Sequence, residues 1–165
     1  MKKDRFLTGI LIFIAVLVVA AVALFFLRDR DRAYGPDDTP GGVLHNYALA
    51  LQNMDYQRAY SYLADWNDKP TYATFRQAFL TRQLDPSNTA LQIGKVLSEE
   101  NGEAIVEVST LYAGSGLFDT GWSSNDRALL VRQDGAWKIT SLPNPYWGWD
   151  WYTPTPMPIP APGKP

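Results

Sequence analysis

The chain lacks cysteine entirely and has one histidine, His45, among its 165 residues. The absence of cysteine excludes disulfides, thiolate nucleophiles, iron–sulfur clusters and a lipid anchor on a cysteine. One histidine without cysteine cannot supply the usual ligand sets for zinc. The sequence therefore predicts neither a metal site nor a cofactor.

Positive charge is also scarce in the larger part of the chain. From Tyr34 onward, 9 Lys and Arg residues stand against 14 Asp and Glu residues, a net charge of −5. A surface with this charge repels phosphate backbones. Nucleic acid is therefore not expected as a partner.

The longest hydrophobic run covers residues 6–27 and contains no charged residue. As a helix it would measure about 33 Å at 1.5 Å per residue, against a hydrocarbon core of about 30 Å. The run predicts a transmembrane helix in contact with lipid, preceded by a short tail over residues 1–5. A cleaved signal peptide is the alternative, because Ala21, Val22 and Ala23 form an A-x-A cleavage pattern, although the run continues beyond it.

Basic residues flank this run on both sides and bear on its orientation. They are equal in number: Lys2, Lys3 and Arg5 before it, and Arg28, Arg30 and Arg32 after it. Because the two counts are equal, the positive charge of the N-terminal amino group is the only difference between the two sides of the run. We therefore expect a single-pass signal anchor in the cell membrane, with the following domain on the extracytoplasmic side.

A linker is expected over residues 28–38, followed by a folded domain over residues 39–145. Thr39, Asp55 and Thr71 are suited to cap three helices at their N-termini. Apolar residues then recur at helical spacing in each segment. They are Val43, Tyr47, Ala50, Leu51 and Met54 in the first, Tyr56, Ala59, Tyr60 and Leu63 in the second, and Tyr72, Phe75, Ala78 and Phe79 in the third.

Apolar and polar residues alternate in the second half of the domain, which is typical of strands. Strands are expected over residues 89–98, 103–113, 126–133 and 136–142, in two hairpins. Asn101-Gly102 and Asp134-Gly135 are suited to their tight turns, because these residue types accept positive φ. Residues 114–125 are expected to form a loop.

Helices followed by a strand meander are typical of the α+β class. We predict about three helices packed on a curved antiparallel sheet of at least four strands. Residues 39–142 resemble the nuclear-transport-factor-two-like superfamily, also called cystatin-like or α+β cone proteins. The resemblance rests on residues 47–60, where Asp55 caps the second helix, and on the closing strand at residues 134–139. It implies a pocket between helices and sheet, used by isomerases, dehydratases and noncatalytic binding or accessory domains.

The pocket that this resemblance implies would be lined by aromatic residues. The candidates are Tyr47, Tyr60, Phe75, Tyr112 and Trp137. Alternation along the strands places no carboxylate on their apolar rows, and Glu107 points away from the pocket. Proton abstraction requires a general base, so we predict no catalytic residue. A small-molecule isomerase or dehydratase that uses this pocket is the alternative.

Aspartic proteases use an Asp-Thr-Gly tripeptide, which is also present here at Asp119, Thr120 and Gly121. In this chain it follows Leu117 and Phe118 within the predicted loop and is interpreted as a turn.

Five aromatic residues stand close together over residues 146–152, and they form the candidate ligand or partner surface: Tyr146, Trp147, Trp149, Trp151 and Tyr152. Such residues could pack over their own domain, stack on sugar rings, bind a protein partner or lie at a lipid interface. Residues 153–165 follow, with proline at every second position from 154 to 162. This pattern predicts an extended tail that could also bind a partner.

The sequence thus predicts a membrane-anchored, noncatalytic binding or accessory module, which could be a subunit of a membrane or envelope complex. In the resembling superfamily the open face of the sheet often pairs with a second copy, so a homodimer is an option.

Overall fold

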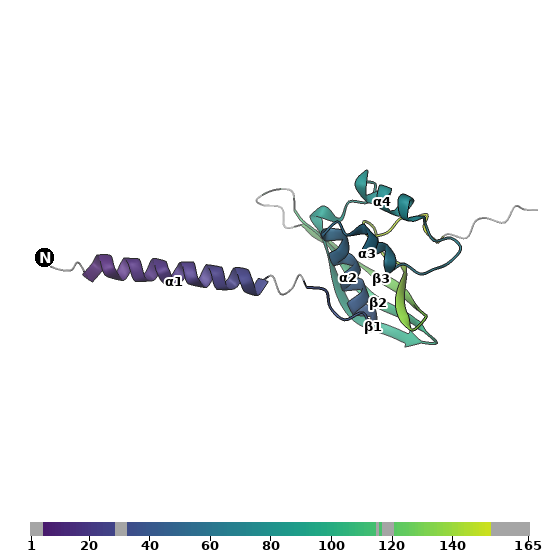
Figure 1. Cartoon of the computed structure of the whole chain (residues 1–165), viewed down its shortest axis with the longest axis horizontal. Helices are drawn as coiled ribbons and strands as arrows, with labels where there is room; N and C mark the ends of the chain where they lie inside the picture. Colours follow the sequence, from purple (N-terminus) through teal and green to yellow (C-terminus); the bar gives the residue numbers. More distant parts are fainter. Residues whose placement is uncertain (1–4, 29–32, 115, 117–120, 153–165) are drawn as a thin grey trace, which may run out of the picture. The chain divides into compact units, whose positions relative to one another are not determined.

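The computed structural model describes residues 5–28, 33–114, 116 and 121–152, and the side chains of α1 only over residues 9–23. The chain divides into two units, Met1–Tyr34 and Gly35–Pro165 (Figure 1). The first contains helix α1 and the second contains all other elements. The predictions for residues 117–120 and for the proline-rich segment 153–165 lie outside the described residues.

Helix α1 runs over Arg5–Arg28. Within the described residues, none of the helices combines the length and the apolar character that a membrane crossing requires. The predicted transmembrane helix over residues 6–27, with its single-pass signal anchor, is therefore corrected. The extracytoplasmic location stays a prediction.

Three helices open the second unit, α2 (Pro40–Gln52), α3 (Tyr56–Ser61) and α4 (Tyr72–Leu80). Each begins directly after its predicted N-cap residue. The side chains of Thr39, Asp55 and Thr71 accept hydrogen bonds from the backbone N–H three residues further on, at 3.1 to 3.2 Å. These bonds satisfy N–H groups that have no partner within the helix.

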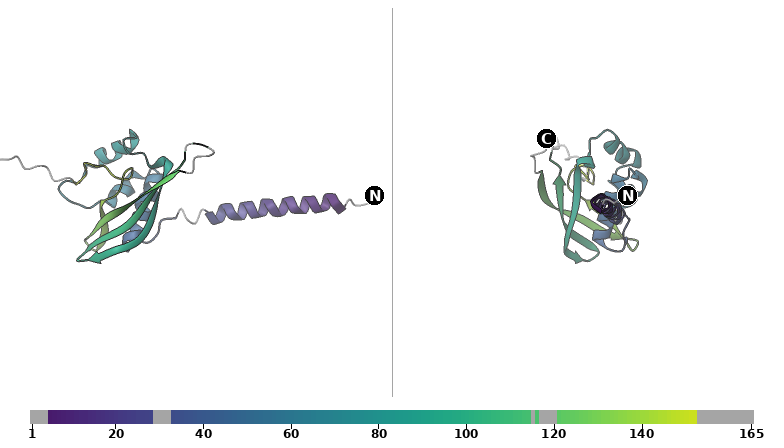
Figure 2. Two further views of the ribbon diagram at one scale, coloured as in Figure 1. Left: turned by 180° about the vertical axis from the view of Figure 1, so that it is seen from behind. Right: turned by 90° about the vertical axis from the view of Figure 1, so that its left-hand side faces the viewer.

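A short 3₁₀ turn, η2 (Pro86–Asn88), leads into a four-stranded antiparallel sheet. Its strands are β1 (Thr89–Glu100), β2 (Glu103–Tyr112), β3 (Trp122–Gln133) and β4 (Ala136–Ser141), in that spatial order. The helices α2, α3 and α4 lie on one side of the sheet (Figures 1 and 2). The predicted α+β class with a four-stranded antiparallel sheet is confirmed.

The two predicted tight turns join β1 to β2 and β3 to β4. Asn101 and Gly102 have φ angles of 54° and 78°, and Asp134 and Gly135 have 51° and 82°. Positive φ at both positions is what a two-residue hairpin turn requires, and it explains the choice of these residue types.

The core lies between the helices and the inner face of the sheet. On β2, Val106, Val108 and Thr110 are buried, whereas Ile105 and Glu107 lie on the other face. This is the alternation predicted from the sequence. Large buried side chains from the helices, from the segment after α3 and from the segment after β4 complete the core: Leu44, Tyr47, Phe75, Leu63 and Tyr146.

Helix α2 is buried on more than the single face that was predicted. Asn46 is fully buried because its amide donates to the carbonyl of Gly35 and to Asp37 Oδ1, while its oxygen accepts from the N–H of Gly35. The segment before the helix is thereby held against it. Met54, predicted to point inward, is instead 73% exposed, because the chain turns there with a φ of 56°.

Candidate functional site

The five residues predicted to line a pocket are distributed over several places. Tyr47 and Phe75 are fully buried, and the Tyr47 hydroxyl donates to the Tyr146 carbonyl at 2.7 Å. Tyr60 contacts Phe75, with ring centroids 5.5 Å apart. Trp137 is buried in β4 under the Arg132 guanidinium. These four side chains make contacts within the domain, and the predicted pocket lining stays a prediction.

Tyr112 is the one of the five that lines a described cavity. This cavity, of about 600 Å³, lies at the end of the sheet beside η2. The rings of Tyr112 and Trp122 stack with centroids 3.9 Å apart and planes within 7°. Gly121 precedes Trp122 with a φ of 69°, and a Cβ there would lie 2.3 Å from the Tyr112 carbonyl oxygen. Glycine is needed at this position because both the φ angle and the space exclude a side chain.

The aromatic residues after β4 fall into two groups. Tyr146, Trp147 and Trp151 are buried against their own domain. The Trp151 ring contacts Phe75 at 5.3 Å between centroids, and it also contacts Trp147 at 5.1 Å. Trp149, by contrast, is 84% exposed, and Tyr152 is half-buried. Of the alternatives for these residues, self-packing describes the first group, and an interaction surface remains a prediction that now depends on Trp149.

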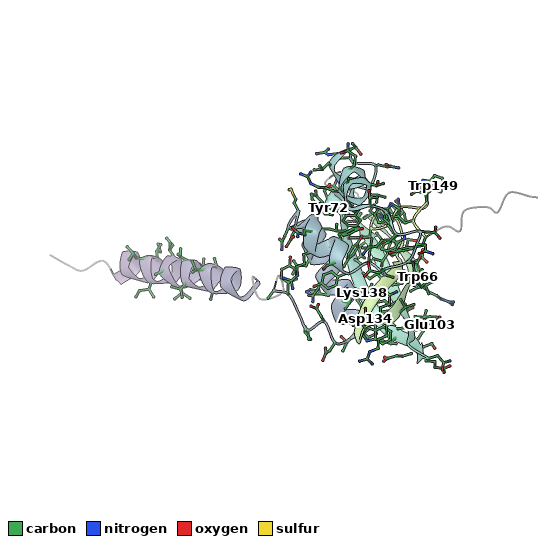
Figure 3. All side chains as sticks on the ribbon, turned by 45° about the vertical axis from the view of Figure 1, so that its right-hand side comes forward. Trp66, Tyr72, Glu103, Asp134, Lys138 and Trp149 are labelled. Carbon is green, nitrogen blue, oxygen red and sulfur yellow. The ribbon has the colours of Figure 1, made fainter. Side chains whose placement is uncertain are left out.

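A groove of about 510 Å³ runs beside these rings. Its aromatic side is formed by Trp66, Trp147, Trp149, Trp151 and Tyr152. Its other side comes from the ends of the strands and the segment after them: Leu129, Thr140, Ser141, Leu142 and Asn144. We call this feature the aromatic groove. Figure 3 shows Trp66 and Trp149 on the same side of the domain.

Trp66 was not among the residues predicted from the sequence. It lies between α3 and α4, in a segment without hydrophobic periodicity, and it is 48% exposed. Its ring meets that of Tyr152 edge to face, with centroids 5.6 Å apart and planes at 81°. Only the tertiary fold brings these two residues together, although a tryptophan in a polar loop was a signal that could have been noted.

Gly148 allows the groove to form, because the Trp151 indole lies directly on its backbone. A Cβ at position 148 would approach Nε1 and Cε2 of Trp151 to 2.5 and 2.6 Å. Contacts this short are not tolerated, so a side chain at 148 would move the indole. Glycine here is a packing requirement of the groove wall.

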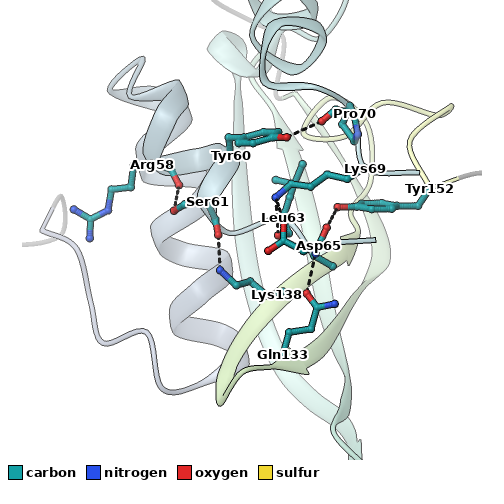
Figure 4. A network of polar contacts seen from close by, with 11 residues as sticks. Arg58, Tyr60, Ser61, Leu63, Asp65, Lys69, Pro70, Gln133, Lys138 and Tyr152 are labelled. Atoms are coloured by element: carbon teal, nitrogen blue, oxygen red, sulfur yellow. Dashed lines mark hydrogen bonds and ion pairs between the residues drawn. The ribbon is translucent and has the colours of Figure 1, made fainter. Parts of the chain in front are cut away.

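The loop that carries Trp66 is tied to the sheet. The N–H of Ala64 donates to the carbonyl of Ile139 in β4 at 3.0 Å. The N–H of Asp65 donates to Gln133 Oε1 at 2.8 Å (Figure 4). These bonds hold both residues before Trp66 on the edge of the sheet, so the indole is placed before any ligand arrives.

Lys69 makes contacts within the same loop. Its ammonium group lies 2.7 Å from Asp65 Oδ1 and donates to the carbonyl of Leu63 at 3.3 Å (Figure 4). It also lies 4.3 Å from the ring centroid of Tyr60. The hydrogen bond from Lys69 lowers the pKa of Asp65, against a smaller opposing effect of burial. The two charges thus compensate each other outside the groove.

The groove itself presents neutral groups. Among the described residues that line it, none is Asp, Glu, Lys, Arg or His. Burial, followed by the field of Asp65, raises the pKa of the Tyr152 hydroxyl well above its usual value. That hydroxyl is therefore protonated at neutral pH, and it donates to the carbonyl of Ala64. The groove offers aromatic faces, hydroxyls and an amide, and no formal charge.

In the part of the chain that the structure describes, no three His, Asp or Glu side chains lie close enough together to hold a metal ion. One buried polar atom stands out: Thr110 Oγ1, on the inner face of β2, has no hydrogen-bond partner among the described residues. It faces the core and does not line either cavity.

Comparison with solved structures gives distant similarities. The chain is similar to a SEC-C motif containing protein from Rhodopseudomonas palustris, with a TM-score of 0.48 and 14% identity, over 65% of this chain and 79% of that one. It is also similar to an NTF2-like protein with a cystatin-like fold from Novosphingobium aromaticivorans, with a TM-score of 0.43 and 16% identity, over 74% and 84%. At such identities and TM-scores, neither likeness transfers chemistry to this chain.

No protein-family model matches the chain, and no curated protein sequence matches it closely.

Proposed function

We propose that this chain is a noncatalytic binding module that docks an extended, proline-bearing segment of a protein partner in the aromatic groove. The observation that carries the proposal is the exposure of Trp66 and Trp149 beside rings that are buried. Tryptophan is enriched at the energetic centres of protein interfaces. Burying most of one such ring favours association by about 3 kcal/mol before the costs of binding are subtracted.

Preorganisation supports this function. Trp66 is positioned by a loop whose backbone is bonded to β4 and to Gln133, and Trp151 is packed on Gly148. A ligand that binds such a surface has to order few protein groups, which reduces the entropy lost on association.

The shape and charge of the groove favour an extended peptide. The rings of Trp66 and Tyr152 meet edge to face, and grooves lined by aromatic rings are the surfaces on which polyproline II helices dock. Such helices have no internal hydrogen bonds, so their carbonyls remain available to donors such as Asn144 and Ser141. A phosphorylated or acidic peptide would need basic residues, and none is among the described lining residues.

Binding without catalysis is supported over the isomerase or dehydratase alternative. Proton transfer requires a group that titrates near neutral pH. The groove lining has no described carboxylate or imidazole, and the raised pKa of Tyr152 makes its hydroxyl a poor base or acid at pH 7. The space that such enzymes would use holds Tyr47 and Phe75.

The test is a fluorescence titration of the full chain with a polyproline peptide of about ten residues. Parallel titrations use a glycine–serine peptide of equal length and a linear glucose oligosaccharide. We expect saturable binding of polyproline, weakened at least about tenfold by Trp149→Ala, the change that loss of roughly 1.4 kcal/mol produces. Trp122→Ala is the matched control, because Trp122 is also exposed but lines the other cavity. Saturable binding of the oligosaccharide alone would assign the groove to sugars and reject the proposal.

A further inference from the structure

We propose that the proline-rich segment of this same chain, residues 153–165, occupies the aromatic groove and competes with the partner for it. The inference rests on the proposed function, because it names an internal ligand for the same surface. In the absence of a partner, the segment would therefore cover the groove of its own chain.

Continuity of the chain is the first argument. Tyr152 is the last described residue and lines the groove. Its ring contacts both Trp66 and Trp147, with centroids 5.6 and 5.7 Å apart. The segment therefore begins at the groove wall. Its 13 residues would extend about 40 Å as a polyproline II helix at 3.1 Å per residue, ample for returning along the groove.

The composition of the segment is the second argument. Proline stands at 154, 156, 158, 160 and 162. Proline lacks the backbone N–H, so this alternation excludes a helix or a central strand and favours polyproline II. With three residues per turn, a proline at every second position places rings on all sides of the helix. Whichever side faces the groove presents proline to Trp66 and Trp149.

Charge is the third argument. The segment carries one charged side chain, Lys164, near its end. The remainder, Thr153–Gly163, is uncharged, as is the described lining of the groove. A neutral ligand can therefore enter the groove without stripping water from a charge that stays unpaired.

Attachment gives the segment an advantage over a free peptide. A short tether supplies an effective concentration of the order of millimolar. A free peptide of identical sequence must compete with that concentration. If the free peptide binds an empty groove with a dissociation constant near 100 µM, the attached copy reduces its apparent affinity about tenfold.

The experiment uses a fluorescently labelled synthetic peptide of residues 153–165 and measures anisotropy with two proteins, the full chain and the chain that ends at Tyr152. We expect the truncated chain to bind the peptide saturably and the full chain to bind it about tenfold more weakly. A peptide with its five alternating prolines replaced by alanine should not bind. Trp149→Ala in the truncated chain should weaken binding, whereas Trp122→Ala should not.

A second variant guards against failure of the truncated chain to fold. The full chain with alanine at positions 154, 156, 158, 160 and 162 should bind the labelled wild-type peptide as tightly as the truncated chain does. Equal affinity of the wild-type full chain and both variants overturns the inference, as does absence of binding to any of them.

Two further readouts distinguish this inference from the proposed function and from binding of the segment of a second copy. Binding of polyproline without binding of the segment peptide rejects self-masking and leaves the proposed function standing, whereas binding of neither rejects both. If the full chain binds the labelled peptide more weakly as its own concentration rises, and sedimentation shows a dimer, the segment comes from a second copy of the chain. That result would overturn the inference that the segment fills the groove of its own chain.

Discussion

The hydroxyl of Tyr152 donates a hydrogen bond to the carbonyl of Ala64, and this bond joins the segment after β4 to the loop that carries Trp66. The two residues are 88 positions apart in the sequence. The same Tyr152 ring lies edge to face against Trp66. The shape of the aromatic groove therefore depends on a contact between two segments that are each irregular.

Tyr152→Phe tests this connection. The substitution keeps the ring and removes the hydroxyl, so it should lower the free energy of unfolding by about 1 kcal/mol, the typical net value of a hydrogen bond. Urea unfolding followed by circular dichroism measures the change. Tyr72→Phe, at an exposed position of α4, is the control and should change stability by less than about 0.5 kcal/mol. Equal effects of the two substitutions would show that the bond has no special role.

The two groups of aromatic residues should differ sharply in their effect on stability. Trp151 is 7% exposed and packs on Phe75, so Trp151→Ala should cost about 3 to 5 kcal/mol through lost burial and a cavity. Trp149→Ala should change the free energy of unfolding by less than about 0.5 kcal/mol, because its ring is in solvent. Paired thermal melts compare them, and a large loss for Trp149 would mean that this ring is structural.

Stability should fall in alkaline solution. Burial, followed by the neighbouring Tyr152 and Tyr146, raises the pKa of Tyr47, and burial likewise raises the pKa of Tyr146. A pKa that is higher in the folded state than in the unfolded state gives stability that is complete below about pH 10 and is lost above it. Urea midpoints should therefore be level from about pH 7 to 9 and decrease beyond about pH 10.

Tyr47→Phe is the variant that isolates this effect. It loses the hydrogen bond to the Tyr146 carbonyl and should be less stable at neutral pH. Its further loss between about pH 9 and 11 should be smaller than in the unchanged chain, because one titrating group has gone. The same alkaline loss in both proteins would assign it to other groups.

Thr110→Val should be neutral or stabilising. The Thr110 hydroxyl is buried without a described hydrogen-bond partner. Replacing it by a methyl group of similar size therefore removes a desolvation cost that no hydrogen bond offsets. Thr140→Val is the contrast, because the Thr140 hydroxyl donates to the carbonyl of Leu129 at 3.1 Å. Thermal melts should place Thr110→Val at or above the unchanged chain. A clear loss would reveal a partner for the Thr110 hydroxyl, such as a bound water.

Much of the fold could be predicted from local signals. Thr39, Asp55 and Thr71 each cap the helix that they were expected to cap, and Asn101-Gly102 adopts the positive φ angles of a tight turn. These outcomes depend on residues close together in the sequence. Strand β3 begins at Trp122, four residues earlier than expected, because Trp122 pairs with Tyr112 across the hairpin. No local pattern among the serines that follow indicates this pairing.

The site was less predictable because it depends on distant contacts. The aromatic residues 146–152 were recognised as a group, but alternation or helical spacing could not separate Trp149 from the buried Trp151 in an irregular segment. Trp66 was missed since its role comes from Tyr152, far along the chain. The transmembrane helix was predicted from the length and composition of residues 6–27, whereas none of the helices in the described part of the chain is long and apolar enough to cross a membrane.

The indole N–H signals of the full chain test the central claim most directly. The chain has 6 tryptophans, and ¹⁵N-labelling gives one resolvable indole signal for each, assignable by single Trp→Phe substitutions. On addition of a polyproline peptide, we expect saturable shifts at Trp66 and Trp149, with Trp122 and Trp137 unchanged. Shifts at Trp122 without shifts at Trp66 and Trp149, or no shift at any of the six, would contradict it.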